Sequence, residues 1–180
     1  MSTRMLIFSI SLLLSMGVVG QSKQEKKAQK KALELKAYQD TRALIETTQY
    51  TFESDWATAN RGRRINLIGN SNYLRIQNDS VYAYLPFFGE RYSGGGYGDS
   101  GPIEIAELIE NYKVELCEKK NRIDIKFSSK NQTERFEIQL TIFGGNNGTV
   151  YVSSNQRSRM NYDGEFGPIR TEEKKTKNEE

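Results

Sequence analysis

Two short stretches decide the fold class. Residues 123–127 read Ile-Asp-Ile-Lys-Phe, and residues 136–142 read Phe-Glu-Ile-Gln-Leu-Thr-Ile. Each stretch alternates apolar and polar side chains, and a repeat of two is that of a β-strand with one buried face and one wet face. Strands of antiparallel sheets alternate in this way, whereas strands of parallel sheets read as continuous apolar runs. The two stretches therefore predict an antiparallel, all-β domain.

The same repeat continues toward both ends of the chain. Tyr50, Phe52, Ser54 and Trp56 alternate with polar residues and predict a first strand with these four side chains on one face. Asn78-Asp79 is a tight hairpin signal. Further strands are predicted around residues 65–68, 73–77, 80–85, 113–117 and 150–152. Seven to nine short strands in a meander close as a small barrel or a sandwich.

A helix is predicted before the first strand. Residues 22–47 contain no glycine or proline, and their apolar side chains recur every three or four residues. The stripe consists of Leu33, Ala37, Tyr38, Thr41, Leu44, Ile45 and Thr48. We expect this N-terminal helix to pack across a barrel mouth or an open sheet edge.

The two ends of the chain differ from its middle. Residues 1–20 combine Arg4, a short apolar run diluted by serines and a small-residue ending, which is the pattern of a cleaved signal peptide. The alternative is an uncleaved membrane anchor. Residues 169–180 are charged or polar after Ile169 and are predicted to be a disordered tail. Residues 37–168 then form a single β-rich domain, exported to the periplasm or the cell exterior.

Charge is distributed unevenly. The chain has 26 Lys and Arg residues against 23 Asp and Glu residues, but the excess lies in the basic helical lead-in, residues 21–36. Without that segment and the signal the remainder is slightly acidic, so we expect no nucleic-acid partner. The lysine run is interpreted as a solvated helix face. The alternative is a weak contact between this helix and an anionic surface.

The residue types available argue against catalysis. The chain has no histidine, which removes the usual general base and the commonest metal ligand. Cys117 is the only cysteine, so no disulfide forms within the chain. We predict a protein that is not an enzyme and has no cofactor or metal. A carboxylate pair such as Glu104 and Glu107 stays open as an alternative, because carboxylate separation is a spatial quantity.

One segment breaks the strand pattern. Residues 84–92 read Tyr-Leu-Pro-Phe-Phe-Gly-Glu-Arg-Tyr, and a glycine-rich stretch follows to Pro102. Pro86 ends the strand because it has no N–H for the ladder, and we expect Gly89 to adopt a backbone conformation closed to other residues. Long loops in small domains are often functional. The candidate ligand-binding residues are Tyr84, Phe87, Phe88, Arg91, Tyr92 and Tyr97. In the alternative interpretation, Phe87 and Phe88 plug the barrel end.

Residues 85–92, Leu-Pro-Phe-Phe-Gly-Glu-Arg-Tyr, resemble the signature of a domain family of unknown function, number 4251. Its members are small exported proteins of Gram-negative bacteria. The resemblance spans about residues 36–166 and also rests on the signal peptide, the helix, the Asn78-Asp79 hairpin and Met160-Asn161-Tyr162-Asp163-Gly164. Residues 103–106 depart from the family pattern. The resemblance implies the fold class and the exported location but no activity.

Two functions fit these observations. The first is a non-catalytic binding or envelope-associated module that contacts an envelope component or a small molecule through the aromatic loop. The second is a lipocalin-like carrier that holds a small apolar ligand inside the barrel, since about eight strands leave room for one small molecule. The two hypotheses differ in whether the barrel interior is filled.

Overall fold

The computed structural model describes residues 23–60, 62–92 and 101–170. Within them the chain forms one α-helix, ten strands and one 3-10 turn. Their bounds are α2 (Lys23–Glu46), β1 (Gln49–Ala59), β2 (Arg64–Asn66), β3 (Tyr73–Gln77), β4 (Ser80–Leu85), β5 (Ile103–Leu108), β6 (Glu110–Cys117), η1 (Glu118–Lys120), β7 (Arg122–Lys130), β8 (Arg135–Phe143), β9 (Asn147–Ser154) and β10 (Met160–Pro168).

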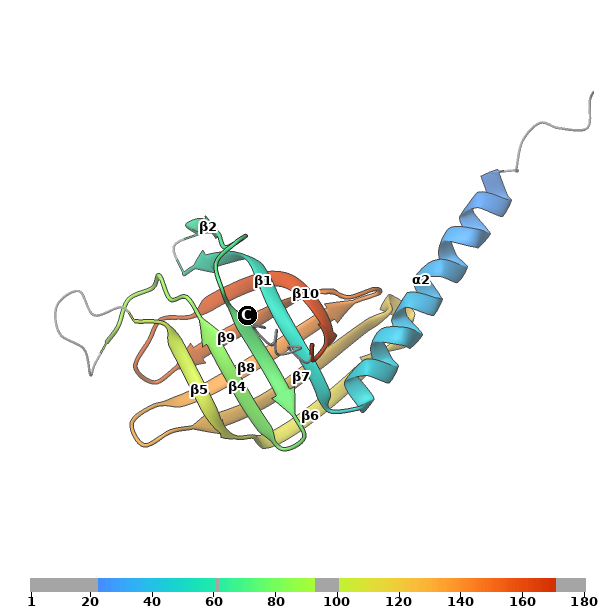
Figure 1. Cartoon of the computed structure of the whole chain (residues 1–180). Coiled ribbons are helices and arrows are strands. Elements are labelled where there is room, and N and C mark those ends of the chain that lie inside the picture. Colours follow the sequence, from blue (N-terminus) through green and yellow to red (C-terminus); the bar gives the residue numbers. More distant parts are fainter. Residues whose placement is uncertain (1–22, 61, 93–100, 171–180) are drawn as a thin grey trace, which may run out of the picture. The chain divides into compact units, whose positions relative to one another are not determined.

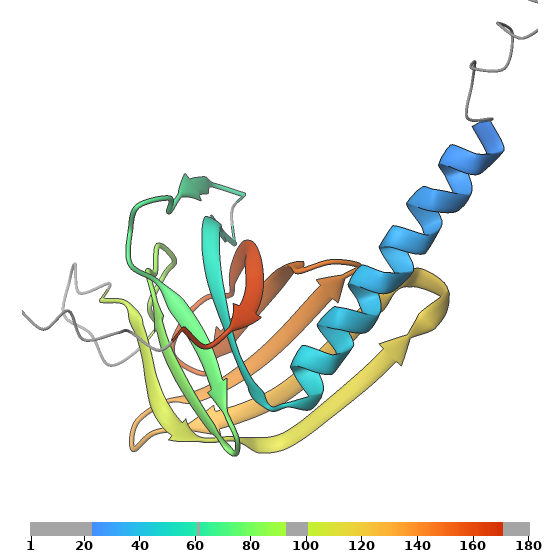
Figure 2. The ribbon, with the colours of Figure 1, turned by 45° about the vertical axis from the view of Figure 1, so that its right-hand side comes forward.

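One antiparallel sheet curls round until its two edge strands approach each other at one end without pairing. The strands follow the order β5-β4-β3-β1-β10-β9-β8-β7-β6, with β2 paired to β1 (Figure 1). The two edge strands, β5 and β6, are consecutive in the sequence, and Figure 2 shows one running into the other. At their junction Ser129 Oγ donates to the Leu108 carbonyl at 3.0 Å. The sheet is therefore nearly closed as a barrel, and the predicted all-β meander with one N-terminal helix is confirmed.

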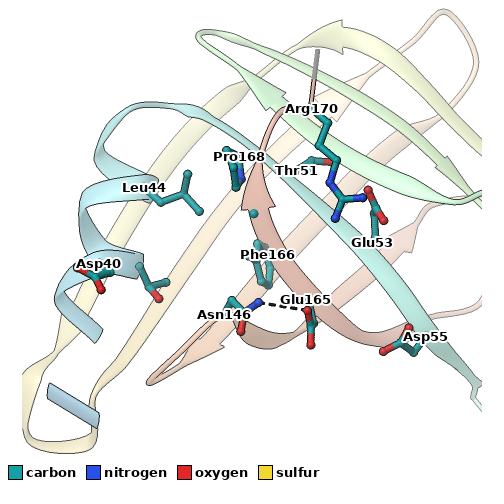
Figure 3. A pocket seen from close by; sticks show the side chains of 12 residues that line it. Asp40, Leu44, Thr51, Glu53, Asp55, Asn146, Glu165, Phe166, Pro168 and Arg170 are labelled. Carbon is teal, nitrogen blue, oxygen red and sulfur yellow. Dashed lines mark hydrogen bonds between the residues drawn. The ribbon is translucent and has the colours of Figure 1, made fainter. Parts of the chain in front are cut away.

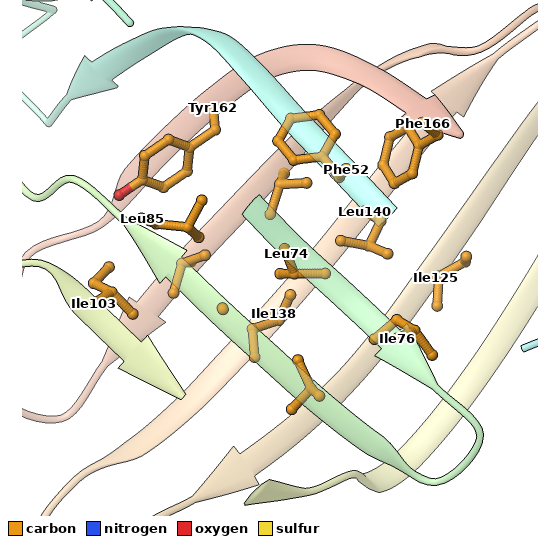
Figure 4. Packing of buried hydrophobic residues seen from close by; sticks show 14 of the residues in the cluster. Phe52, Leu74, Ile76, Leu85, Ile103, Ile125, Ile138, Leu140, Tyr162 and Phe166 are labelled. Carbon is orange, nitrogen blue, oxygen red and sulfur yellow. The ribbon is translucent and has the colours of Figure 1, made fainter. Parts of the chain in front are cut away.

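The barrel interior is filled with apolar side chains. Phe52 and Phe166 pack with ring centroids 4.8 Å apart, and both are buried. Isoleucines and leucines from β3, β4, β5, β7 and β8 join them in one continuous cluster (Figure 4). The polar residues that alternate with this cluster face outward, as the period of two requires. The alternation in residues 123–127 and 136–142 lies as predicted, in β7 and β8.

The chain divides into two compact units between Leu33 and Glu34. In the second unit, Tyr38, Thr41 and Ile45 lie one turn apart on α2 and are buried. Thr41 Oγ1 donates to the Gly145 carbonyl in the β8–β9 turn at 2.5 Å, so this part of the helix packs at one end of the barrel. By contrast, residues 23–36 are exposed throughout. Among the described residues, no helix combines the length and the apolar character needed to cross a membrane.

The first strand departs from its predicted parity. Tyr50, Phe52 and Ser54 face inward as expected, but the β1–β10 register shifts between Ser54 and Trp56. This β-bulge turns Trp56 outward, where it is half-buried under the guanidinium of Arg64, and buries Ala57 instead. The prediction for Trp56 was therefore wrong. Strands β5 and β10 were not among the strands predicted from the repeat.

Candidate functional site

The aromatic segment, residues 86–92, begins where β4 stops. Pro86 follows Leu85, the last residue of β4, and its carbonyl accepts a hydrogen bond from the Tyr162 hydroxyl at 2.8 Å. Tyr162 is buried in the core, and this burial raises the pKa of its hydroxyl well above the ordinary value. The hydroxyl therefore stays protonated and donates, which fixes the first turn of the segment to β10.

Residues 90–92 lie against the connection between β9 and β10. The Ser158 N–H donates to the Glu90 carbonyl at 2.8 Å, and the Glu90 N–H donates to Ser158 Oγ at 2.9 Å. The Tyr92 N–H donates to the Gln156 carbonyl at 2.7 Å, and Arg91 forms an antiparallel bridge with Arg157. The segment is thus tied by backbone hydrogen bonds across the end of the barrel.

A buried ion pair lies beneath this connection. Arg157 Nε donates to both carboxylate oxygens of Glu134, at 3.0 and 3.2 Å, and the two side chains are only 9% and 3% exposed. Arg157 also donates to the Gly101 and Pro102 carbonyls and lies over the Phe87 ring. One guanidinium therefore holds the chain on both sides of the glycine-rich stretch. Sequence reasoning missed Glu134 and Arg157, because neither stands in a motif.

Gly89 is required for space. A Cβ atom there would come within 2.2 Å of Ser158 Oγ and 2.8 Å of the Phe87 ring. Its backbone φ is not in the left-handed region, which among the described glycines is occupied by Gly62, Gly69 and Gly145. The prediction that Gly89 adopts a special backbone conformation was therefore wrong. Glycine is required at this position because the backbone lies too close to Ser158 for a Cβ atom.

The predicted site residues have different environments. Phe88 and Tyr92 are 39% and 63% exposed, and Arg91 between them is half-buried. Phe87 instead faces inward and belongs to the core cluster. Tyr84 lies on the outer face of β4, paired with Tyr73 of β3. The sixth candidate residue, Tyr97, lies outside the described residues.

A small hollow of about 210 Å³ lies beside Phe88. Phe88, Gly89 and Glu90 form one side, and Ala59, Asn60, Arg63 and Ser158 form the rest. We call the exposed side chains of Phe88 and Tyr92, together with this hollow, the Phe88–Tyr92 surface. The hollow has a size that fits one side chain or one small chemical group of a partner.

Tyrosines outside the aromatic segment extend the exposed aromatic area. Tyr73, Tyr82 and Tyr84 are exposed on the outer face of β3 and β4, and Arg75 lies over the Tyr73 ring at 5.4 Å. Of these three tyrosines, only Tyr84 was predicted from the sequence as a site residue. The alternation of residues 73–84 gave the signal for the other two, since it places all three tyrosines on the polar face.

A larger hollow, of about 700 Å³, lies elsewhere, between α2 and the outer faces of β1 and β10. Figure 3 shows acidic side chains around it, including Glu53 and Glu165, with Arg170 directed toward Glu53. Glu53 and Glu165 are direct cross-strand partners. We assign this hollow no role, because a polar outer face is the ordinary exterior of an antiparallel sheet. In residues 23–60, 62–92 and 101–170 no group of three acidic or cysteine side chains is placed to hold a metal.

Known proteins with a similar structure or sequence identify the family of this chain. A crystal structure of a DUF4251 family protein from Bacteroides eggerthii has a TM-score of 0.58 and 20% sequence identity, covering 76% of this chain and 91% of that one, which supports the fold. No curated protein matches the chain. The sequence model of the family described as "Domain of unknown function (DUF4251)" matches residues 32–166. The chain therefore belongs to the DUF4251 family, as the Leu85–Tyr92 signature indicated.

Proposed function

We propose that this chain is an exported, non-catalytic binding module that contacts another envelope component through the Phe88–Tyr92 surface. One observation carries the proposal: Phe88 and Tyr92 are exposed on a backbone that is itself fixed. Two backbone–backbone hydrogen bonds and one from the Glu90 N–H to Ser158 Oγ join residues 90–92 to residues 156–158, and the buried Glu134–Arg157 pair lies below them.

This arrangement is suited to binding for a physical reason. Exposed aromatic rings leave apolar area in contact with water, which favours covering them with a partner. Because the supporting backbone is already ordered, a partner does not have to order it on binding. Aromatic side chains are enriched at protein contact sites, where they serve as anchors. Phe88, next to its own hollow, is the anchor we assign, with Tyr92 beside it.

The filled barrel supports this proposal over the carrier hypothesis. A lipocalin-like carrier needs an apolar cavity for its ligand. Here Phe52, Phe166, Tyr162 and the surrounding aliphatic side chains occupy the interior, and Phe87 packs against them. A partner would therefore bind to the end of the barrel and not within it.

The sequence supports the rest of the proposal. The chain has no histidine, so the usual general base is missing and a binding role is favoured over a catalytic one. The pattern of residues 1–20 supports export and cleavage close to Gln21. N-terminal sequencing of the protein recovered from the cell envelope tests this part, and an intact Met1 would contradict it.

The binding surface is tested with matched double variants. Immobilised mature protein is exposed to the solubilised envelope fraction of the producing bacterium, and retained material is quantified. Phe88→Ala/Tyr92→Ala should abolish retention without lowering the melting temperature by more than a few degrees. Phe143→Ala/Tyr151→Ala is the control, because it removes two exposed rings from β8 and β9. Equal retention by both variants would refute the proposal.

A further inference from the structure

Strand β6 has an edge that no other strand covers in the described part of the chain. It ends the hydrogen-bonded order of the sheet and pairs with β7 on one side. Four consecutive side chains, residues 113–116, are exposed, whereas a strand covered on one face would alternate. Val114 and Leu116 stand opposite the buried Ile125 and Ile123, yet they are 41% and 42% exposed. The inner face of the sheet is therefore only partly covered at Val114 and Leu116.

Charges on the outer face of β6 are poorly matched within the chain. Lys113 is directly opposite Lys126 of β7, and Glu115 is directly opposite Asp124. Like charges facing each other across a strand pair are destabilising. Strand β7 therefore gives neither Lys113 nor Glu115 a directly opposite partner of opposite charge.

The sequence of the edge is complementary to itself. Residues 112–116 read Tyr-Lys-Val-Glu-Leu, so apolar residues occupy the first, third and fifth positions, with a base and an acid between them. Antiparallel pairing of two such strands about Val114 sets Lys113 of each copy opposite Glu115 of the other. The same pairing sets Tyr112 opposite Leu116 and Val114 opposite Val114. Moving the centre to Lys113 or to Glu115 would instead set like charges opposite each other.

We propose that β6 is the interface for a second copy of this chain, through antiparallel edge-to-edge pairing centred on Val114. The pairing satisfies backbone groups on the open edge, covers Val114 and Leu116, and gives Lys113 and Glu115 partners of opposite charge. Figure 2 shows β6 following β5 along the edge of the sheet, and its regular part begins at Lys113, after a register shift that starts at Glu110. Because so few residues pair, the dimer is weak and depends on protein concentration.

The experiment uses charge reversals and a mixture. Sedimentation velocity of the mature chain, residues 21–180, is measured over a range of concentrations at low salt. Wild type should shift from monomer to dimer, and high salt should weaken the dimer. Lys113→Glu and Glu115→Lys, each alone, should weaken association about tenfold or more, since each sets two pairs of like charges opposite one another. A 1:1 mixture of the two variants should associate as wild type does, because the acidic edge of one meets the basic edge of the other.

Two controls keep the result interpretable. Lys36→Glu makes the same charge change on the exposed part of α2 and should leave association unchanged. Thermal melts establish that each variant folds, as expected for substitutions at exposed positions. A wild type that stays monomeric throughout would overturn the proposal. A dimer that neither charge reversal weakens would also overturn it, because the contact would then lie elsewhere. A mixture of the two variants that fails to restore association would overturn it as well.

Discussion

Arg157 is the residue whose loss should affect the Phe88–Tyr92 surface most. Replacing it with Met keeps the aliphatic bulk but leaves the Glu134 carboxylate, 3% exposed, without its cation. Removing one partner of a buried pair typically costs about 3–5 kcal/mol. The Gly101 and Pro102 carbonyls lose their donor as well. We therefore expect Arg157→Met to lower the free energy of unfolding by about 3–5 kcal/mol.

Urea unfolding of the mature chain measures this cost, and a matched variant calibrates it. Arg122→Met removes the same group from an ion pair with Asp124, in which the arginine side chain is 33% exposed. More exposed pairs contribute about 0–1 kcal/mol, so this control should change little. The double variant Glu134→Leu/Arg157→Met should recover most of the loss, because an apolar pair often replaces a buried ion pair at no cost.

Hydrogen exchange gives an independent readout of the same change. The amides of Glu90, Tyr92 and Ser158 form the hydrogen bonds that tie the aromatic segment down. In Arg157→Met these amides should exchange faster, while amides in the centre of β8 should follow only the global loss of stability. The reasoning is refuted if Arg157→Met costs no more than Arg122→Met and leaves these three amides as protected as in wild type.

Three further changes test the packing. Gly89→Ala should destabilise the domain by about 1–3 kcal/mol, because its methyl group would overlap Ser158. Gly167→Ala is the control and should be nearly neutral, since a Cβ there meets no atom within 4 Å. Equal melting temperatures of the two variants would contradict this. Above pH 10 the raised pKa of Tyr162 keeps a proton on the folded state that the unfolded state releases, so the free energy of unfolding falls with rising pH by up to about 1.4 kcal/mol per pH unit. Urea unfolding at pH 8, 10 and 11 should therefore show a shallower fall for Tyr162→Phe than for wild type. Parallel plots of the free energy of unfolding against pH would be evidence against this role. Trp56→Ala should lower the free energy of unfolding less than Phe52→Ala does in urea unfolding, because the bulge places Trp56 outside the core. The reverse order would argue against the bulge.

The fold was predictable where alternation is unbroken, as in residues 123–127 and 136–142. Strand β10 was missed although Met160, Tyr162 and Phe166 are buried with a period of two, because Gly164 interrupts the pattern with a residue that lacks a side chain. Trp56 was placed on the wrong face because a bulge inserts one residue and reverses parity, and nothing local in the sequence marks it.

The candidate site was only partly predictable from the sequence. The aromatic segment was found because Pro86 stops a strand and several rings follow it within a few residues. Which rings are exposed could not be found, since Phe87 and Phe88 are neighbours of the same type and only the folded backbone turns one inward. The Glu134–Arg157 pair joins residues 23 positions apart through two different loops, so its contact exists only after β8 and β9 have paired.

The most direct test of the binding proposal is a hydrogen-exchange footprint. Deuterium uptake of the mature chain is compared with and without the solubilised envelope fraction, with peptides covering both ends of the barrel. We predict added protection in residues 86–92 and 154–158, which carry the Phe88–Tyr92 surface, and unchanged uptake in the β8–β9 turn at the opposite end. Protection confined to that turn, or the same protection in the Phe88→Ala/Tyr92→Ala variant, would contradict the proposal.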